Sequence, residues 1–102
     1  MLGHFEYQVL KAVQGVQGKA YGVPIRAFIE ANFNRTVSFG ALYTVLGRLS
    51  DKGFVKSEIL PATAERGGRR KKAYVLSGTG QAAIREKEST MRIGMELGGA
   101  YA

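Results

Sequence analysis

The sequence predicts a mainly α-helical fold with one small β-hairpin (α+β), in the order helix, helix, helix, hairpin, helix. Three segments before residue 53 carry apolar residues at helical spacing. Two strand-like runs follow, joined by a loop that contains proline and glycine, and a last helical segment comes after them. The length of 102 residues suits one domain, since domains commonly hold about 100–150 residues.

The first two predicted helices are short, and each has one apolar face. The first covers about residues 3–14 and ends before Gly15, with near-helical spacing of Phe5, Val9, Leu10 and Val13. The second begins near residues 21–24, where Pro24 is tolerated because a first-turn N–H has no helical partner. Its apolar face consists of Ile25, Phe28, Ile29 and Phe33, and residues 34–36 form the next turn.

The third predicted helix has the clearest pattern. Ser38 is a favourable N-cap and Gly53 suits the left-handed residue that ends a helix, so this helix runs from Ser38 to about Lys52. Its predicted buried stripe follows the spacing i, i+3, i+4, i+7 and consists of Leu42, Val45, Leu46 and Leu49.

A hairpin and one more helix complete the predicted chain. Residues 54–60 and 70–76 are the strands, and Ser77 or Thr79 caps a helix that ends near Leu97. This order of elements is that of a winged helix-turn-helix, with the hairpin as the wing. We expect residues 1–76 to form it and residues 77–102 to add a C-terminal helix and tail to the same compact unit.

The charge of the chain is strongly positive and concentrated in one place. The formal net charge is +7 and the isoelectric point is near 10.0. Residues 66–72 read RGGRRKK, which is five cations and no acid beside a predicted strand. Such a loop favours the phosphate backbone of nucleic acid, and double-stranded DNA is therefore the expected partner.

Other chemistry has little support in the composition. The chain has no cysteine and a single histidine, His4, so we expect no disulfide, no metal site and no cofactor. It contains no phosphate-binding GxxxxGK[ST] loop and no plausible Ser-His-Asp set, so we do not expect an enzyme. Without a run of about 20 apolar residues or a secretory signal, a cytoplasmic protein away from membranes is expected.

The third helix is predicted to read DNA. Opposite its leucine stripe lie Gly40, Thr44, Gly47 and Arg48, flanked by Ala41 and Tyr43. Small side chains let a helix approach the floor of a major groove only about 12 Å wide. Each exposed glycine costs about 1 kcal/mol relative to alanine, and close approach to DNA would offset that cost. Alternatively, Gly47 makes room for a neighbouring core element, and Tyr43 is a residue at the rim of the core.

The remaining predicted DNA contacts flank this helix. Arg35 and Thr36 precede it, and the wing, residues 61–72, grips the backbone or enters the minor groove. The full predicted set is Arg35, Thr36, Ser38, Gly40, Ala41, Tyr43, Thr44, Arg48, Arg66, Arg69, Arg70 and Lys71.

Four segments resemble the PadR family of bacterial transcriptional regulators, namely FEYQVLKAV, KAYGVPIRAFIE, VSFGALYTVLGRLSDKGFVKSE and RGGRRKKAYVLSGTGQAAI. The resemblance covers about residues 3–84, with the specific motifs VSxGALYxxLxRLxxKG and a basic wing that ends in YxLSxxG. It implies a winged-helix repressor that binds inverted-repeat operators as a homodimer.

The resemblance also implies how two subunits would meet. The helix after the wing would serve as a dimerisation helix and pack on the partner subunit's N-terminal region. Carried over to this chain, the interface residues are Leu2, Phe5, Val9, Ile84, Met91 and Met95. The final helix is short for the family, which leaves little surface for a small-molecule effector, the other partner that the family suggests.

Two other functions fit part of the pattern. A small RNA-binding or ribosome-associated protein would share the size and charge, but strands that display aromatic residues for stacking on RNA bases are not evident. A winged helix used only for protein–protein assembly would carry a neutral or acidic wing. The basic wing favours DNA.

Overall fold

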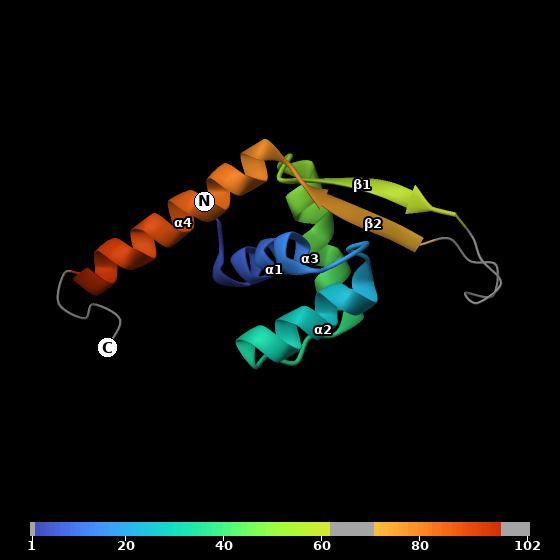
Figure 1. Cartoon of the computed structure of the whole chain (residues 1–102), viewed down its shortest axis with the longest axis horizontal. Coiled ribbons are helices and arrows are strands. Elements are labelled where there is room, and N and C mark those ends of the chain that lie inside the picture. The colour runs from blue at the N-terminus through green and yellow to red at the C-terminus, as the bar shows by residue number, and fades with distance from the viewer. Residues whose placement is uncertain (1, 62–70, 97–102) are drawn as a thin grey trace.

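A computed structural model describes residues 2–61 and 71–96, with only the backbone of residues 94–96. The elements follow the order α1 (His4–Gly15), α2 (Gly22–Phe33), α3 (Phe39–Asp51), β1 (Val55–Leu60), β2 (Lys71–Leu76) and α4 (Gly78–Glu96). The predicted α+β fold is confirmed, and Figure 1 shows three helices packed together, with the hairpin and α4 extending in opposite directions.

The core lies where α1, α2 and α3 meet. The predicted stripe of α3 is buried, and Val9, Leu10, Ile25 and Ile29 from the other two helices are completely buried against it. An apolar side chain of this size contributes about 1.5–3 kcal/mol when it is fully buried. Because all the apolar faces of these helices are used in one cluster, the rotation of α3 about its axis is fixed.

The ends of α3 form as predicted. The Ser38 hydroxyl accepts a hydrogen bond from the Ala41 N–H at 3.1 Å, which satisfies a donor that the helix leaves unpaired. Gly53 has φ +78°, the left-handed conformation that glycine adopts without steric cost. The chain then enters β1 two residues later.

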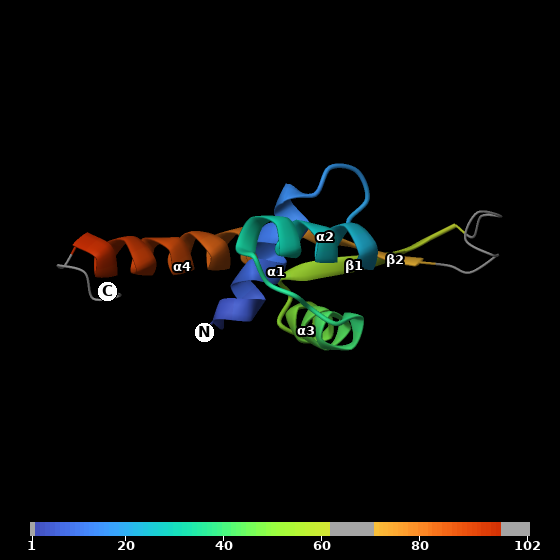
Figure 2. The same ribbon diagram turned by 90° about the horizontal axis from the view of Figure 1, so that it is seen from below.

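The hairpin is joined to the helices at its base. β1 and β2 pair antiparallel with Val55 opposite Leu76 and Leu60 opposite Lys71. The Tyr74 N–H donates to the Ala20 carbonyl at 2.9 Å, so β2 is also tied to the segment between α1 and α2. Val55 and Tyr74 are buried in the common core, and the far end of the hairpin projects past α3 (Figure 2).

Helix α4 begins tightly against the body and then leaves it. The Ser77 hydroxyl caps the helix by accepting from the Gly80 N–H at 2.9 Å, which decides between the two predicted caps. A side chain at Gly80 would overlap the Phe54 carbonyl, so only glycine permits this close approach. Ile84 is buried, whereas Ile93 is half exposed, because among the described residues it is the earlier part of α4 that packs on the body of the protein.

A polar network anchors α4 to α1. The Tyr7 hydroxyl donates to Glu88 Oε2 at 2.8 Å, and Lys11 Nζ lies 3.2 Å from the same oxygen. The hydrogen bond from Tyr7, with the charge of Lys11, lowers the pKa of Glu88 despite its partial burial. Burial and the bond to Glu88 raise the pKa of Tyr7 to about 12. The network therefore favours an ionised Glu88 beside a neutral Tyr7.

The substitution Glu88→Ala is expected to destabilise the fold by about 1 kcal/mol, less than a buried charged hydrogen bond because Glu88 is partly exposed. The lowered pKa means that the stabilisation is full above the ordinary carboxyl pKa of 4.5 and is lost as the pH falls through the lowered value. Urea unfolding at several pH values measures this. The control is Glu86→Ala, two residues earlier on another face of α4, and an equal loss in both variants would contradict the network.

Candidate nucleic-acid interface

The outward face of α3 is open along its whole length. Gly40, Ala41, Thr44 and Arg48 are exposed, and a Cβ built at Gly40 or Gly47 would meet no atom within 4 Å. Gly47 therefore makes no room for a core element, and that alternative is wrong within the described chain. The Thr44 hydroxyl donates to the Gly40 carbonyl at 2.9 Å, so its oxygen remains able to accept a hydrogen bond from a partner.

The C-terminal end of α3 is electrostatically different. Lys52 Nζ lies 2.8 Å from Glu6 Oε2, and the Gly3 N–H donates to the other oxygen of the same carboxylate at 2.8 Å. Burial would raise the pKa of Glu6, but these hydrogen bonds and the charges of Lys52 and Arg48 lower it overall. An acid therefore sits beside the last turn of α3, close to the charges of Lys52 and of Arg48, which belongs to that same turn.

Tyr43 lies on the flank of α3 and is both exposed and supported. Its ring is 48% exposed and stacks on Phe39 with centroids 6.1 Å apart, and the Arg26 guanidinium lies 4.6 Å from the Phe39 centroid. Its hydroxyl reaches Gly22 at the start of α2. Burial and the nearby Tyr43 raise the pKa of Tyr74, so Tyr43 also approaches β2. Tyr43 thus bridges α3, α2 and the hairpin.

The residues ahead of α3 have different surroundings from those expected. Arg35 donates from Nη1 to Gln8 Oε1 at 3.1 Å, and its guanidinium lies 4.3 Å from the Phe5 centroid. Arg35 is exposed but held against α1, and Thr36 is exposed. In the wing, Lys71 is partly buried, whereas Arg66, Arg69 and Arg70 lie outside the described residues.

The sequence of this chain matches the model of the PadR-like family of transcriptional regulators over residues 9–86. The chain belongs to that family. A comparison with curated proteins gave no significant match.

Solved structures of PadR-like proteins share the fold. A PadR-like transcription factor from Bacteroides fragilis is 24% identical, with a TM-score of 0.78 over 96% of this chain and 89% of that one. A transcriptional regulator from Clostridium thermocellum is 19% identical, with a TM-score of 0.78 over 98% and 91%. Bacillus subtilis PadR, solved in complex with operator DNA, is 20% identical, with a TM-score of 0.68 over 81% of this chain and 45% of that one.

Three predicted interface residues of this PadR-like chain have a different role. Val9 is completely buried, and Leu2 and Ile84 are nearly so, all within the core of their own subunit. Val9 and Ile84 therefore offer no surface to a partner, and their assignment to a dimer interface is wrong, whereas Leu2 still lines the groove described below. An apolar stripe at helical spacing does not show whether it is buried in the subunit's own core or in an interface with a partner subunit. Phe5 and Met91 are partly buried against the same core, and the side chain of Met95 is outside the description.

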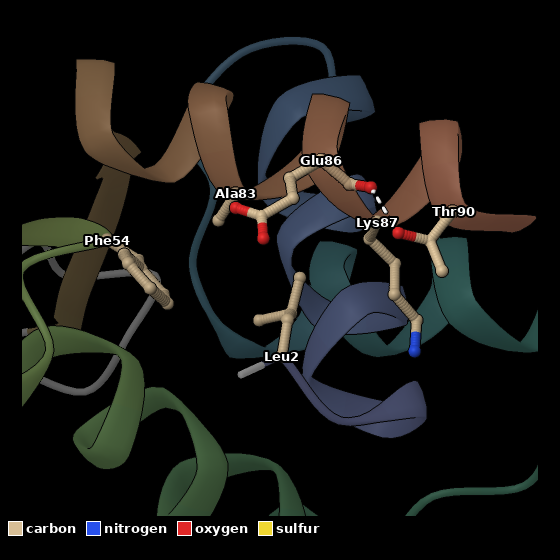
Figure 3. A pocket seen from close by; sticks show the side chains of 6 residues that line it. All are labelled: Leu2, Phe54, Ala83, Glu86, Lys87 and Thr90. Atoms are coloured by element: carbon tan, nitrogen blue, oxygen red, sulfur yellow. Dashed lines mark hydrogen bonds between the residues drawn. The ribbon is translucent and has the colours of Figure 1, made fainter.

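A groove lies beside the buried residues at the base of α4 (Figure 3). Its volume is about 340 Å³, and its lining consists of Leu2, Phe54, Ala83, Glu86, Lys87 and Thr90. Leu2 and Phe54 face α4 across it, and the Thr90 hydroxyl donates to the Glu86 carbonyl at 3.0 Å at its edge. The lining is therefore mixed, with the apolar side chains of Leu2, Phe54 and Ala83 beside the charged groups of Glu86 and Lys87.

Among residues 2–61 and 71–96, no group of three His, Asp or Glu side chains is placed to hold a metal ion. No helix in that part of the chain combines the length and apolarity needed to cross a membrane.

Sequence reasoning missed the surroundings of Tyr43. Arg26, Gly22 and Lys72 were not expected near the third helix, because their contacts join segments far apart in the chain. One signal was present: Gly22 stands where a helix begins, although glycine is a poor helix former.

The Ser38 cap is expected to matter for stability. Ser38→Ala should cost about 1 kcal/mol, because the Ala41 N–H loses its acceptor, whereas Ser38→Asn should retain most of the stability. Thermal unfolding of both variants measures the difference. Equal stability of the alanine variant and the wild type would show that the cap contributes nothing.

Proposed function

We propose that this PadR-like protein is a DNA-binding repressor that recognises a palindromic operator as a homodimer. The observation that carries the proposal is the open face of α3, with two glycines that meet no other part of the described chain. A glycine inside a helix costs about 1 kcal/mol relative to alanine, so an exposed pair implies a compensating gain when a partner approaches closely. The Bacillus subtilis relative solved with operator DNA supports DNA as that partner.

In the proposed complex α3 enters the major groove with residues 38–48, so that Gly47 also lies against the groove. Gly40, Ala41 and Thr44 face the base edges, and Arg48 reaches a base or phosphate at the rim. Ser38 and Thr36 lie at the entrance, and Lys71, with Arg66, Arg69 and Arg70 of the wing, neutralises backbone phosphates. Arg35 would contribute by holding the turn against α1, and it reaches DNA only if it leaves Phe5 and Gln8.

The proposed dimer forms through the exposed half of α4. Ile93 is half exposed there and Met91 is partly buried, so an apolar strip continues beyond the part that α1 covers. The proposed interface then consists of Phe5, Met91, Ile93 and Met95. It no longer includes Leu2, Val9 and Ile84, which the subunit's own core buries. Two-fold symmetry would then set two α3 helices about 34 Å apart, one turn of DNA.

A small-molecule effector remains a prediction. The groove at the base of α4 has a volume of about 340 Å³, within the range of about 300–1,000 Å³ typical of small-molecule sites. An effector bound there would touch both α4 and the chain leading into β1, and would couple the dimer helix to the wing.

The proposal predicts binding to the DNA upstream of the gene for this chain, with at least tenfold preference over a scrambled duplex of equal length at about 0.15 M salt. Fluorescence anisotropy measures the affinities, and light scattering gives the mass of the free protein and of the complex. We expect two 11.1 kDa chains in each. Equal affinity for both duplexes, or tighter binding of structured RNA, would favour the RNA-binding alternative. A monomer on DNA would contradict the symmetric operator.

The glycines of α3 give a second test, which separates folding from binding. Gly47→Ala should stabilise the protein by about 1 kcal/mol, because the methyl group meets nothing within 4 Å. The same change should weaken operator binding about tenfold, since the added methyl holds the helix off the groove floor. Thermal unfolding and anisotropy measure the two effects. The control is Ser50→Ala, exposed at the end of α3, where unchanged binding is expected.

A further inference from the structure

A second cavity joins three elements that are distant in sequence. Its volume is about 160 Å³, and it is lined by Tyr21, Gly22, Val23, Tyr43, Lys71 and Lys72. These residues come from the start of α2, the flank of α3 and the beginning of β2. The volume is below the range of about 300–1,000 Å³ in which pockets enclose drug-sized ligands, so the cavity suits a single small group.

The cavity holds two cations that the rest of the described chain leaves unneutralised. Neither Lys71 nor Lys72 takes part in an ion pair between described residues. The Lys71 ammonium lies 4.7 Å from the Tyr21 centroid, a contact that orients the ammonium but does not cancel its charge. Lys72 follows Lys71 in β2, is exposed and also lines the cavity, so both residues supply positive charge for an anion there.

The third polar group is the Tyr43 hydroxyl, and its place is fixed from both sides. The ring is held by the stack on Phe39, which the Arg26 guanidinium covers in turn. On the other side, a Cβ at Gly22 would overlap the Tyr43 hydroxyl, so the observed position requires glycine at residue 22. The structure thus keeps a hydrogen-bond donor at the mouth of a cationic cavity.

We propose that this cavity binds one phosphate of the DNA backbone, with Lys71 and Lys72 supplying the charge and the Tyr43 hydroxyl donating a hydrogen bond. The inference rests on the proposed DNA binding and adds Lys72, Tyr21 and Gly22 to the interface. One phosphate would be held by groups from the recognition helix and the wing together. That contact would fix how far α3 advances along the groove, since backbone contacts set register while base contacts select sequence.

The test uses the full chain and the operator duplex, with affinity measured across a range of salt concentrations. Lys72→Ala should weaken binding about tenfold and reduce the slope of log affinity against log salt by about 0.9, the value for one phosphate contact. Tyr43→Phe should weaken binding several-fold without changing the slope, because the lost hydroxyl is uncharged. Tyr43 is half exposed, so its variant is expected to fold, and thermal unfolding verifies this.

The matched control is Lys56→Ala. Lys56 is exposed on β1 opposite Val75, at the other end of the hairpin, and its removal takes away the same charge. Its slope should stay within experimental error of the wild type. If the wild type binds the operator and both Lys72→Ala and Tyr43→Phe bind equally well, the phosphate site is wrong while the proposed function stands. If the wild type binds no DNA, the proposed function itself fails.

A chemical substitution on the DNA identifies the ligand directly. Single phosphates of the operator are replaced in turn by neutral methylphosphonates. At the contacted position the wild type should lose as much affinity as Lys72→Ala loses, and the variant should lose nothing more. Absence of such coupling at every position would overturn the assignment to the DNA backbone. If no position shows coupling and the protein also binds inorganic phosphate at micromolar concentration, the cavity binds a free phosphate compound. That result would equally overturn the assignment to the DNA backbone.

Discussion

The burial of the leucine stripe of α3 is the constraint on which the rest of this molecule depends. Leu42, Leu46 and Leu49 are completely buried between α1 and α2. Rotating α3 by one residue, about 100°, would expose them and bury Arg48 or Thr44 without partners. The helix therefore has one available orientation, and the residues opposite the stripe must face outward. The shape of the outward face follows from the core.

The residues of that outward face lower the stability of α3. Glycine at two exposed helical positions lowers helix propensity, and a chain of 102 residues has only a modest core to compensate. The compensation lies in specific end contacts: the Ser38 cap, the left-handed Gly53 and the ion pair of Glu6 with Lys52. The Tyr7–Glu88–Lys11 network does the same for α4, which has few apolar contacts beyond Ile84. These polar contacts stabilise the helices where the small apolar core contributes little.

The sequence was sufficient to predict the features that depend on a repeating apolar pattern or on the residues at a helix end. The stripe of α3, its cap and its stop are local patterns with one physical solution, and all three formed as predicted. Sequence reasoning failed where a residue had two partners to choose from. Val9 and Ile84 have the spacing of an interface, yet they face their own core, because periodicity does not say which surface covers a stripe. For Arg35 the sequence did not reveal its contacts with Phe5 and Gln8, 27 or more residues away, which hold it against α1, while its contact with DNA stays a prediction.

The arrangement of ion pairs completes the electrostatic picture. The acids Glu6, Glu30, Glu58 and Glu88 are each paired with a cation on the body of the protein. Of the cations near α3 and the start of β2, Arg48, Lys71 and Lys72 take part in no ion pair between described residues. Lys56, Arg85, Lys87 and Arg92 are likewise in no ion pair between described residues, and neither is the acid Asp51 at the end of α3. Part of the net charge of +7 therefore lies near the open face of α3 and part on β1 and α4. The charges of Arg48, Lys71 and Lys72 would attract a polyanion to this side of the described chain, where the open, glycine-containing face of α3 allows close approach.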